Sequence, residues 1–228
     1  RSLAGLVAGS LGPIMVILFE KKKYEELTSL TITFVKFLSF TIAVPIIILC
    51  VYAKEILNLW LGPEFIHLSP LIIIVTLPLI INLGTLPILS INIAVKKIQI
   101  PALVNCLLAT FGIGLSITLF KITTMGYYAI AISYVITLTL KNAVFIPWYA
   151  TKILNKPWYV FFKTHFITLI FSSLLFIFVL SFKHYAHVFN INLLVEMVII
   201  GTLGMLLTFF FYSKEEKNSF VSMLRRKV

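Results

Sequence analysis

Long uninterrupted runs of apolar residues dominate the hydrophobic pattern of this chain. They do not alternate apolar with polar residues, so they predict helices and not the strands of a membrane barrel. Seven runs reach or approach the ~20 residues that a helix needs to cross ~30 Å of hydrocarbon. They cover residues 3–19, 30–52, 69–95, 101–120, 126–150, 159–182 and 191–212. The pattern predicts an all-α polytopic membrane protein with seven transmembrane helices.

The composition agrees with a lipid environment. Hydrophobic residues make up 60% of the chain, charged residues make up 12%, and the mean hydropathy is +1.06. Soluble domains are about 45–50% apolar and about 25% charged. A water-soluble core of this size has no room for so much apolar surface, so the main solvent of this chain is expected to be lipid.

The positive charges fall mainly on one side of the predicted helices. Of the 19 Lys and Arg residues, thirteen lie in one set of connections and four in the other, and Lys36 and Lys141 lie inside spans. The larger set is Lys21, Lys22, Lys23, Lys96, Lys97, Lys152, Lys156, Lys163, Lys214, Lys217, Arg225, Arg226 and Lys227. The smaller set is Arg1, Lys54, Lys121 and Lys183. The positive-inside rule then predicts a cytoplasmic C-terminus, and the charge is explained by topology without nucleic-acid binding.

An odd number of spans leaves Arg1 outside. The first apolar run has no basic flank or small-residue cleavage site of a signal peptide. We therefore expect further helices upstream of this chain.

The sequence also limits the chemistry. It contains no Asp, which excludes a Ser-His-Asp set, and no phosphate-binding glycine loop or HExxH motif is present. Cys50 and Cys106 both fall inside apolar runs, so they form neither a disulfide framework nor a zinc site. We expect neither enzymatic activity nor a cofactor.

The stretch "KEILNLWLGPEFIHLSP", residues 54–70, separates two strongly apolar runs. It predicts a short helix on the outer membrane surface, with Trp60 at interfacial depth and a stop at Gly62-Pro63. Ser69 is expected to cap the next helix, with Pro70 at its first position.

Several stretches resemble one transporter family. "ILNLWLGPEF" is similar to a signature of the polysaccharide-transport branch of the multidrug/oligosaccharidyl-lipid/polysaccharide flippase superfamily. "SLAGLVAGSLGPIMVILFEKKKYEELTSL" resembles the eighth helix of that branch and the connector after it, and "INIAVKKIQIPALVN" resembles its loop between helices ten and eleven. "MGYYAIAISYVITLTLKN" resembles its twelfth helix, although Tyr128 stands where a second glycine is usual. The order of these matches aligns the whole chain with helices eight to fourteen of a fourteen-helix fold.

The resemblance implies a function and a division of the chain. It implies flipping of polyprenyl-pyrophosphate-linked oligosaccharide across the cytoplasmic membrane for polysaccharide biosynthesis, through a cavity between two six-helix lobes. Residues 1–152 would be transport-lobe helices eight to twelve, and residues 153–228 two added helices with a basic cytoplasmic tail. The partners would be the bilayer, the lipid-linked oligosaccharide and an enzyme of polysaccharide assembly, without nucleic acid.

Two other functions remain open. A multidrug exporter of the same superfamily would export small cations, and it would be expected to carry buried carboxylates that the core spans lack. A complete seven-helix receptor would need no upstream half, but the last helix has no lysine for retinal.

Five residues within the spans are candidates for substrate binding: Lys141, Asn142, Lys36, Asn105 and Asn82. Ionisable groups inside a membrane mark functional sites by default. Each lysine has an alternative, which is that its long side chain extends to the membrane surface. The asparagines either line the cavity or only join neighbouring helices by hydrogen bonds. Glu196 suits a helix N-terminus and is a candidate for a coupling ion, while His165, His184 and His187 are expected at the membrane interface.

Overall fold

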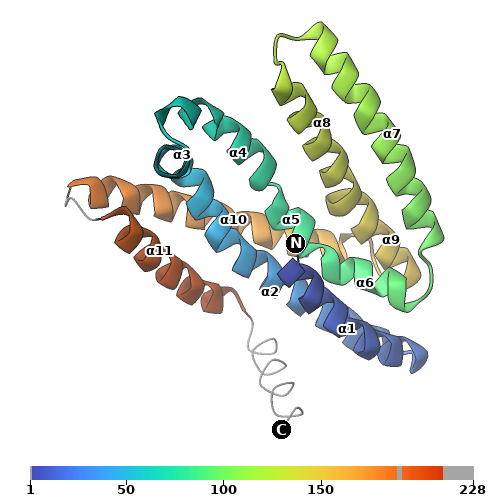
Figure 1. The fold of residues 1–228 in the computed structure, drawn as a ribbon. Helices are drawn as coiled ribbons and strands as arrows, with labels where there is room; N and C mark the ends of the chain where they lie inside the picture. The colour runs from blue at the N-terminus through green and yellow to red at the C-terminus, as the bar shows by residue number, and fades with distance from the viewer. Residues whose placement is uncertain (1, 189–191, 213–228) are drawn as a thin grey trace.

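The computed structural model describes residues 2–188 and 192–212, and these form helices joined by short connections, with no β-strand in the described ranges (Figure 1). The first group is α1 (Ser2–Glu20), α2 (Tyr24–Val51), α3 (Ala53–Trp60), the 3₁₀-helix η1 (Pro63–Leu68), α4 (Ser69–Thr76), α5 (Leu79–Gly84) and α6 (Leu86–Ala94). The second group is α7 (Gln99–Ile122), α8 (Tyr127–Thr139), the π-helix η2 (Leu140–Phe145), α9 (Ile146–Ile153), α10 (Tyr159–Val188), α11 (Leu193–Thr208) and the 3₁₀-helix η3 (Phe209–Phe211).

The protein is an all-helical polytopic membrane protein, as predicted. Six helical stretches of the described residues are long and apolar enough to cross a membrane, and Leu11–Glu20 forms a shorter apolar helix within α1. The six are Tyr24–Val51, Pro63–Gly84, Gln99–Ile122, Tyr127–Ile153, Tyr159–Tyr185 and Leu193–Phe211. Several extend a few residues beyond the predicted apolar runs, as Tyr24–Val51 and Tyr159–Tyr185 do.

The predicted span 69–95 is not one helix. It is broken into α4, α5 and α6, with Pro78 at the N-cap of α5 and Pro87 in the first turn of α6. Proline lacks a backbone N–H and clashes with the preceding turn, which explains both breaks. Pro45, in contrast, lies inside a continuous α2.

The stretch of residues 54–70 contains the predicted short helix, and its position on the outer membrane surface stays a prediction. α3 buries Ala53 and Leu57 and leaves Trp60 78% exposed. It ends before Gly62, whose φ of +101° is a conformation that favours glycine. The expected cap at Ser69 is wrong: η1 runs directly into α4, Leu68 occupies the N-cap, and Ser69 is a buried helical residue.

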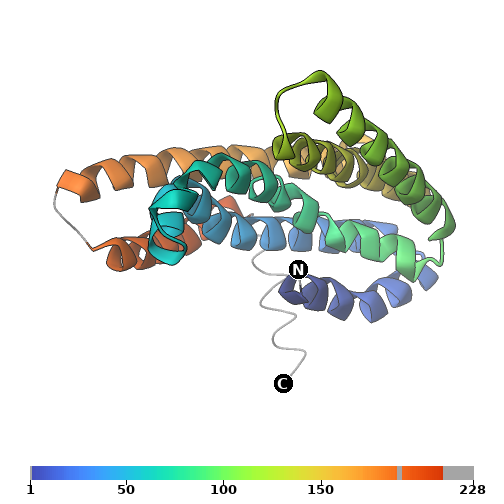
Figure 2. The same ribbon diagram turned by 45° about the horizontal axis from the view of Figure 1, so that its top comes forward.

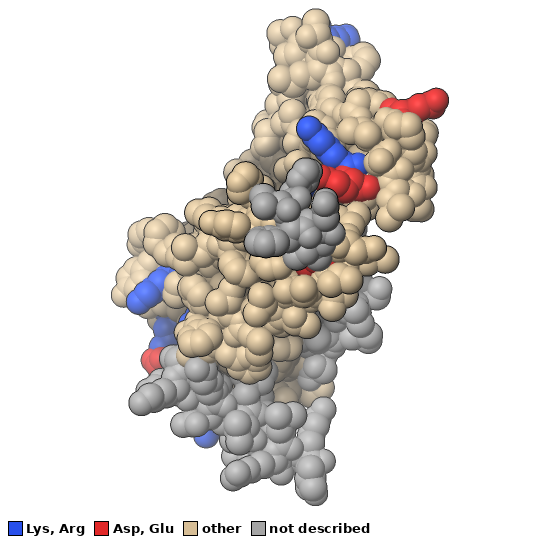
Figure 3. Space-filling model, turned by 90° about the vertical axis from the view of Figure 1, so that its left-hand side faces the viewer, with Lys and Arg blue, Asp and Glu red and all other residues tan. Residues whose placement is uncertain are grey.

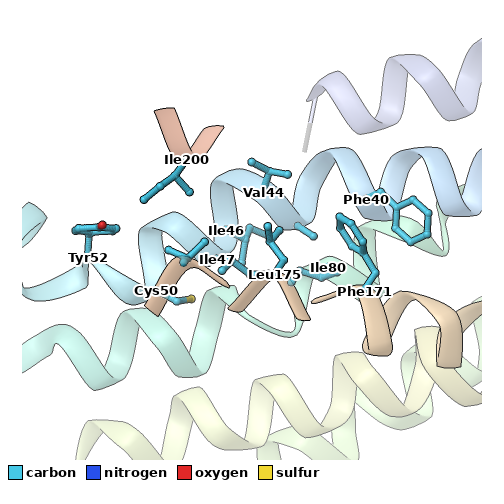
Figure 4. Packing of buried hydrophobic residues seen from close by; sticks show 12 residues of the cluster. Phe40, Val44, Ile46, Ile47, Cys50, Tyr52, Ile80, Phe171, Leu175 and Ile200 are labelled. Carbon is cyan, nitrogen blue, oxygen red and sulfur yellow. The ribbon is translucent and has the colours of Figure 1, made fainter. Parts of the chain in front are cut away.

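The central element is α2, which packs most extensively against α10, α5 and α11. One core cluster is formed where α2 meets these helices, and its labelled members come from all four (Figure 4). Phe40 lies against Phe171 of α10, with ring centroids 4.5 Å apart. Gly84 permits α5 to approach Ser39 of α2, since a methyl group at position 84 would overlap the Ser39 hydroxyl. A second cluster joins α1, α2, α6, α9 and the start of α10.

The α7–α8 hairpin stands apart from this core (Figures 1 and 2). α7 packs mainly along α8, and Pro101 is its one residue that the structure records as buried. Gly112 brings the two helices together, because a methyl group there would lie 2.6 Å from the Thr137 hydroxyl. Most of the surface of α7 is therefore apolar and exposed.

The two sets of connections lie at opposite ends of the molecule. At one end, Lys156 of the α9–α10 connection pairs with Glu25 at the start of α2. At the other, the Tyr128 hydroxyl donates to the carbonyl of His67, joining the start of α8 to η1. Charged side chains on the face in Figure 3 gather toward the two ends, with almost no charge on the visible surface between them. Arg1 and the predicted basic tail lie outside the described residues, and the direction of insertion stays a prediction.

Candidate functional site

A widened helical turn positions two of the candidate residues. Lys141 and Asn142 belong to η2, where the N–H of Ile146 donates to the carbonyl of Lys141, five residues earlier. Pro147 follows in the first turn of α9. Its ring would collide with the carbonyl of Ala143 in a regular α-helix, and the wider turn before it relieves that contact. π-Helical turns are rare and are often found at functional sites.

Lys141 lies inside a helical stretch that is long and apolar enough to cross a membrane. The span runs from Tyr127 to Ile153, so Lys141 is fourteen residues from one end and twelve from the other. At 1.5 Å per residue these distances are about 21 and 18 Å along the helix. The predicted span ended at residue 150, three residues before the end of this stretch. The role of Lys141 in substrate binding stays a prediction.

Asn105 of α7 faces Lys141. The Lys141 ammonium donates a hydrogen bond of 3.0 Å to the Asn105 carboxamide oxygen. Asn105 is six residues after the start of α7, so this pair lies inside the membrane span and not at its end. The bond joins two candidate residues that are 36 positions apart.

Asn142 and Asn82 form a second hydrogen-bonded pair. The Asn142 amide donates 3.3 Å to the Asn82 oxygen, and the Asn82 amide approaches the Thr139 hydroxyl at 3.4 Å. Asn82 lies on the broken segment α5 and is only 4% exposed. The arrangement shows Asn82 in an interhelical role, tying α5 to the turn that carries Lys141.

Lys36 lies on a different helix from the other four candidates. It is on α2 and is 9% exposed, so the protein encloses it and its side chain does not extend into open surroundings. α2 packs mainly on α10, α5 and α11, whereas Lys141 lies between α7 and the end of α8. Four of the five candidate residues are thus joined in two hydrogen-bonded pairs, Lys141–Asn105 and Asn142–Asn82, and Lys36 belongs to neither pair.

The Lys141–Asn105 pair borders a pocket of about 420 Å³ between α7 and α8. Besides this pair, its lining is mostly apolar with a few hydroxyls. These residues are Leu108, Ala109, Gly112, Ile113, Ser116, Ile117, Ile130, Ser133, Tyr134, Thr137 and Leu138. An ammonium group and neutral hydrogen-bonding groups at one end suit an anion, and no carboxylate is among the described lining residues. The residues with defined positions contain no group of three His, Cys, Asp or Glu side chains that could hold a metal ion.

A second polar cluster lies at the C-terminal end of α2, and it was not predicted. Lys183 of α10 pairs with Glu55 at 2.5 Å, donates to the Val51 carbonyl at 2.9 Å and faces the ring of Tyr52 at 4.7 Å. The Tyr52 hydroxyl donates to Glu196 of α11, which is 6% exposed. Glu196 lies in the first turn of α11, as expected. This cluster connects α10 and α11 to α2.

Buried polar residues are more numerous than the sequence indicated. His165 was expected at the membrane interface, and this stays a prediction; it is buried within the protein on α10, and within the described structure neither ring nitrogen has a hydrogen-bond partner. His184 is exposed, and the side chain of His187 lies outside what the structure describes. Asn92 of α6 is fully buried, also without a partner for its carboxamide in the described part of the chain.

The sequence is similar to a known membrane protein. It is 34% identical over 163 residues to the "Uncharacterized membrane protein EpsK" of Bacillus subtilis (strain 168). The aligned part is 72% of this chain and 32% of that protein, so the chain spans about a third of the length of the relative that it matches. No protein-family model and no solved structure matches the chain. The similarity supports a multi-pass membrane protein.

Proposed function

We propose that this chain is part of a flippase that moves polyprenyl-pyrophosphate-linked oligosaccharide across the cytoplasmic membrane, for the synthesis of cell-surface polysaccharide. The observation that carries the proposal is the Lys141–Asn105 pair, which places a positive charge and a carboxamide beside a pocket between two helical stretches that are long and apolar enough to cross a membrane. The sequence resemblance supplies the identity of the cargo.

A flippase must lower the cost of taking a charged head group out of water. An isolated anion in hydrocarbon faces a desolvation cost of many kcal/mol, so the transport path has to supply compensating charge and hydrogen bonds. Lys141 would act as a point charge toward the pyrophosphate, since its ammonium presents three donors. Asn105 and Asn142 would add neutral donors and acceptors, and Asn82 would hold Asn142 in place.

The distribution of carboxylates disfavours export of cationic drugs. Between residues 27 and 192 the glutamates are Glu55 and Glu64, and both lie in the surface connection formed by α3 and η1. The pocket between α7 and α8 contains Lys141 as its charged residue. A cation in this pocket would meet a like charge instead of a compensating one.

The test is transport of two kinds of cargo by the full-length protein in reconstituted vesicles. One vesicle set contains a fluorescent polyprenyl-pyrophosphate oligosaccharide, and the other contains a cationic dye. The proposal expects the lipid-linked sugar to become accessible in the opposite leaflet, with no accumulation of dye. Accumulation of dye without movement of the lipid-linked sugar would overturn the flippase assignment and favour the exporter.

A further inference from the structure

The pocket between α7 and α8 is elongated along the helices. On α7 its lining extends from Asn105 to Ile117, and along α8 and η2 it extends from Ile130 to Lys141. Twelve residues of helix correspond to about 18 Å. This exceeds half the ~30 Å hydrocarbon thickness, so the pocket is long enough to follow a lipid chain through one leaflet. We refer to it as the α7–α8 groove.

The two ends of the α7–α8 groove differ in chemistry. Lys141 and Asn105 lie at one end, joined by their hydrogen bond, while Ile117 and Ile130 lie at the other. The flanking apolar side chains are exposed, as shown by Ile113, which is 64% exposed. One charged end followed by an apolar channel complements an amphiphile with an anionic head and a hydrocarbon chain.

The charged end is also the end expected to face the cytoplasm. Asn105 lies close to the start of α7, which follows the basic connection containing Lys96 and Lys97. Positive connections predict the cytoplasmic side. An anionic lipid from the inner leaflet would therefore reach Lys141 with its phosphate and extend its chain toward the far end of the α7–α8 groove.

We propose that the α7–α8 groove binds the hydrocarbon chain of the polyprenyl carrier, with the phosphate of the carrier at Lys141 and Asn105. This inference rests on the proposed function and adds a location for the lipid part of the cargo. A groove between just two helices suits one chain, and a polyprenyl phosphate has one chain where a phospholipid has two. The carrier would then remain lipid-exposed while its head group is neutralised.

Photo-crosslinking in vesicles tests the inference. The probes are a polyprenyl phosphate and a phosphatidylglycerol, each with a diazirine on its hydrocarbon chain, and the labelled positions are read by peptide mass spectrometry. We expect the polyprenyl probe to label residues 113–117 and 130–134, and excess unlabelled polyprenyl phosphate, but not phosphatidylglycerol, to compete. Equal labelling and competition by phosphatidylglycerol would overturn the inference and identify a membrane phospholipid as the occupant.

Two matched substitutions on α7 separate the groove from the rest of the helix. Ser116 lines the α7–α8 groove, whereas Thr118 is exposed and lies outside it. Ser116→Phe should lower labelling of the groove by about tenfold because the ring occupies the space of the chain. Thr118→Phe adds the same ring and should leave labelling unchanged. Equal effects of the two substitutions would overturn the inference.

The two proposals can fail separately. Flipping by the wild-type protein without labelling of the α7–α8 groove overturns the lipid site and leaves the proposed function in place. Labelling of the groove by the polyprenyl probe without any flipping supports the lipid site and contradicts the proposed function.

Discussion

The hydroxyl of Tyr52 lies 2.6 Å from a carboxylate oxygen of Glu196, although the two residues are 144 positions apart. Tyr52 follows the end of α2, and Glu196 is in the first turn of α11. Both side chains are buried. The bond therefore links the last described membrane helix to the central one.

Replacing Tyr52 should weaken this link. Tyr52→Phe removes the donor and leaves the buried carboxylate of Glu196 without it, so the free energy of unfolding should fall by about 1 kcal/mol. Thermal unfolding of the purified protein in detergent measures the effect. Tyr185→Phe is the control, because Tyr185 lies on α10 with 65% of its surface exposed. Additive losses for Tyr52→Phe and Glu196→Gln in a double-mutant cycle would contradict a direct interaction.

The charge at Lys141 should matter more than its exact hydrogen-bond geometry. Lys141→Arg keeps the sign and should retain much of the flipping rate, whereas Lys141→Glu should abolish flipping. Lys141→Ala should slow flipping by roughly 10–100-fold, the range for loss of one charge-assisted hydrogen bond in the transition state. Lys121→Ala is the control, since Lys121 is an exposed residue at the end of α7. Wild-type flipping by Lys141→Ala, at normal membrane levels, would exclude a role in binding the head group.

Asn82 should contribute to stability, because its hydrogen bonds hold α5 against the turn that carries Lys141. Asn82→Leu has a similar volume but cannot bond Asn142 or Thr139, so we expect a loss of about 1–2 kcal/mol in unfolding free energy. Asn58→Leu, on the exposed side of α3, provides the comparison and should change stability little. If both variants unfold at the wild-type temperature, Asn82 does not support this region.

Gly84 should be intolerant of a side chain. Gly84→Ala would push against the Ser39 hydroxyl and should cost about 1–2 kcal/mol in unfolding free energy. Ser39→Gly should restore most of that loss, because it removes the overlapping atoms and a hydroxyl that has no hydrogen-bond partner among the described residues. Gly114→Ala is the matched control, since nothing lies within 4 Å of its added methyl group. A similar stability change at both glycines would show that α2 and α5 do not meet as described.

The last two helices should contribute more to stability than to cargo choice. Phe171 and Leu175 of α10 and Ile200 of α11 are buried against α2, so deleting residues 159–228 exposes an apolar face of that helix. The expected result is lower membrane abundance and lower thermal stability of the deletion variant, with no change in sugar selectivity. A stable deletion variant that flips a different oligosaccharide would contradict this.

The sequence predicted the helices well because the signal for a membrane helix is strong. Each run of apolar residues exceeds what a soluble helix needs, and the basic connections mark one side. The short helix α3 was also predictable, since Trp60 and the Gly62-Pro63 pair are local signals. The breaks around α5 were only suggested by Pro78 and Pro87, because Pro45 has the same local character and leaves α2 intact.

The candidate site was predictable in its members but not in its pairing. Depth within an apolar run identified Lys141 and Asn142, yet their bonds reach Asn105 and Asn82 across 36 and 60 positions. Such contacts depend on how helices pack and leave no periodic signal in one sequence. The partners of Lys183 and the burial of His165 were missed for the same reason. Pro147 was a usable signal for the π-helix, since a proline inside an apolar run disturbs the turn before it.

The wide turn at Leu140–Phe145 determines the directions in which the side chains of α8 and α9 point relative to one another. Before it, α8 directs Ser133 and Thr137 toward the α7–α8 groove. After it, α9 directs Ile146 and Ala150 into the second core cluster. In a helix of 3.6 residues per turn, each residue added or removed rotates everything that follows by about 100°. Deleting one residue from this turn would restore a regular helix, but it would also turn one of these faces away from its partner. The extra residue thus allows a single helix to serve two neighbours that lie in different directions around its axis.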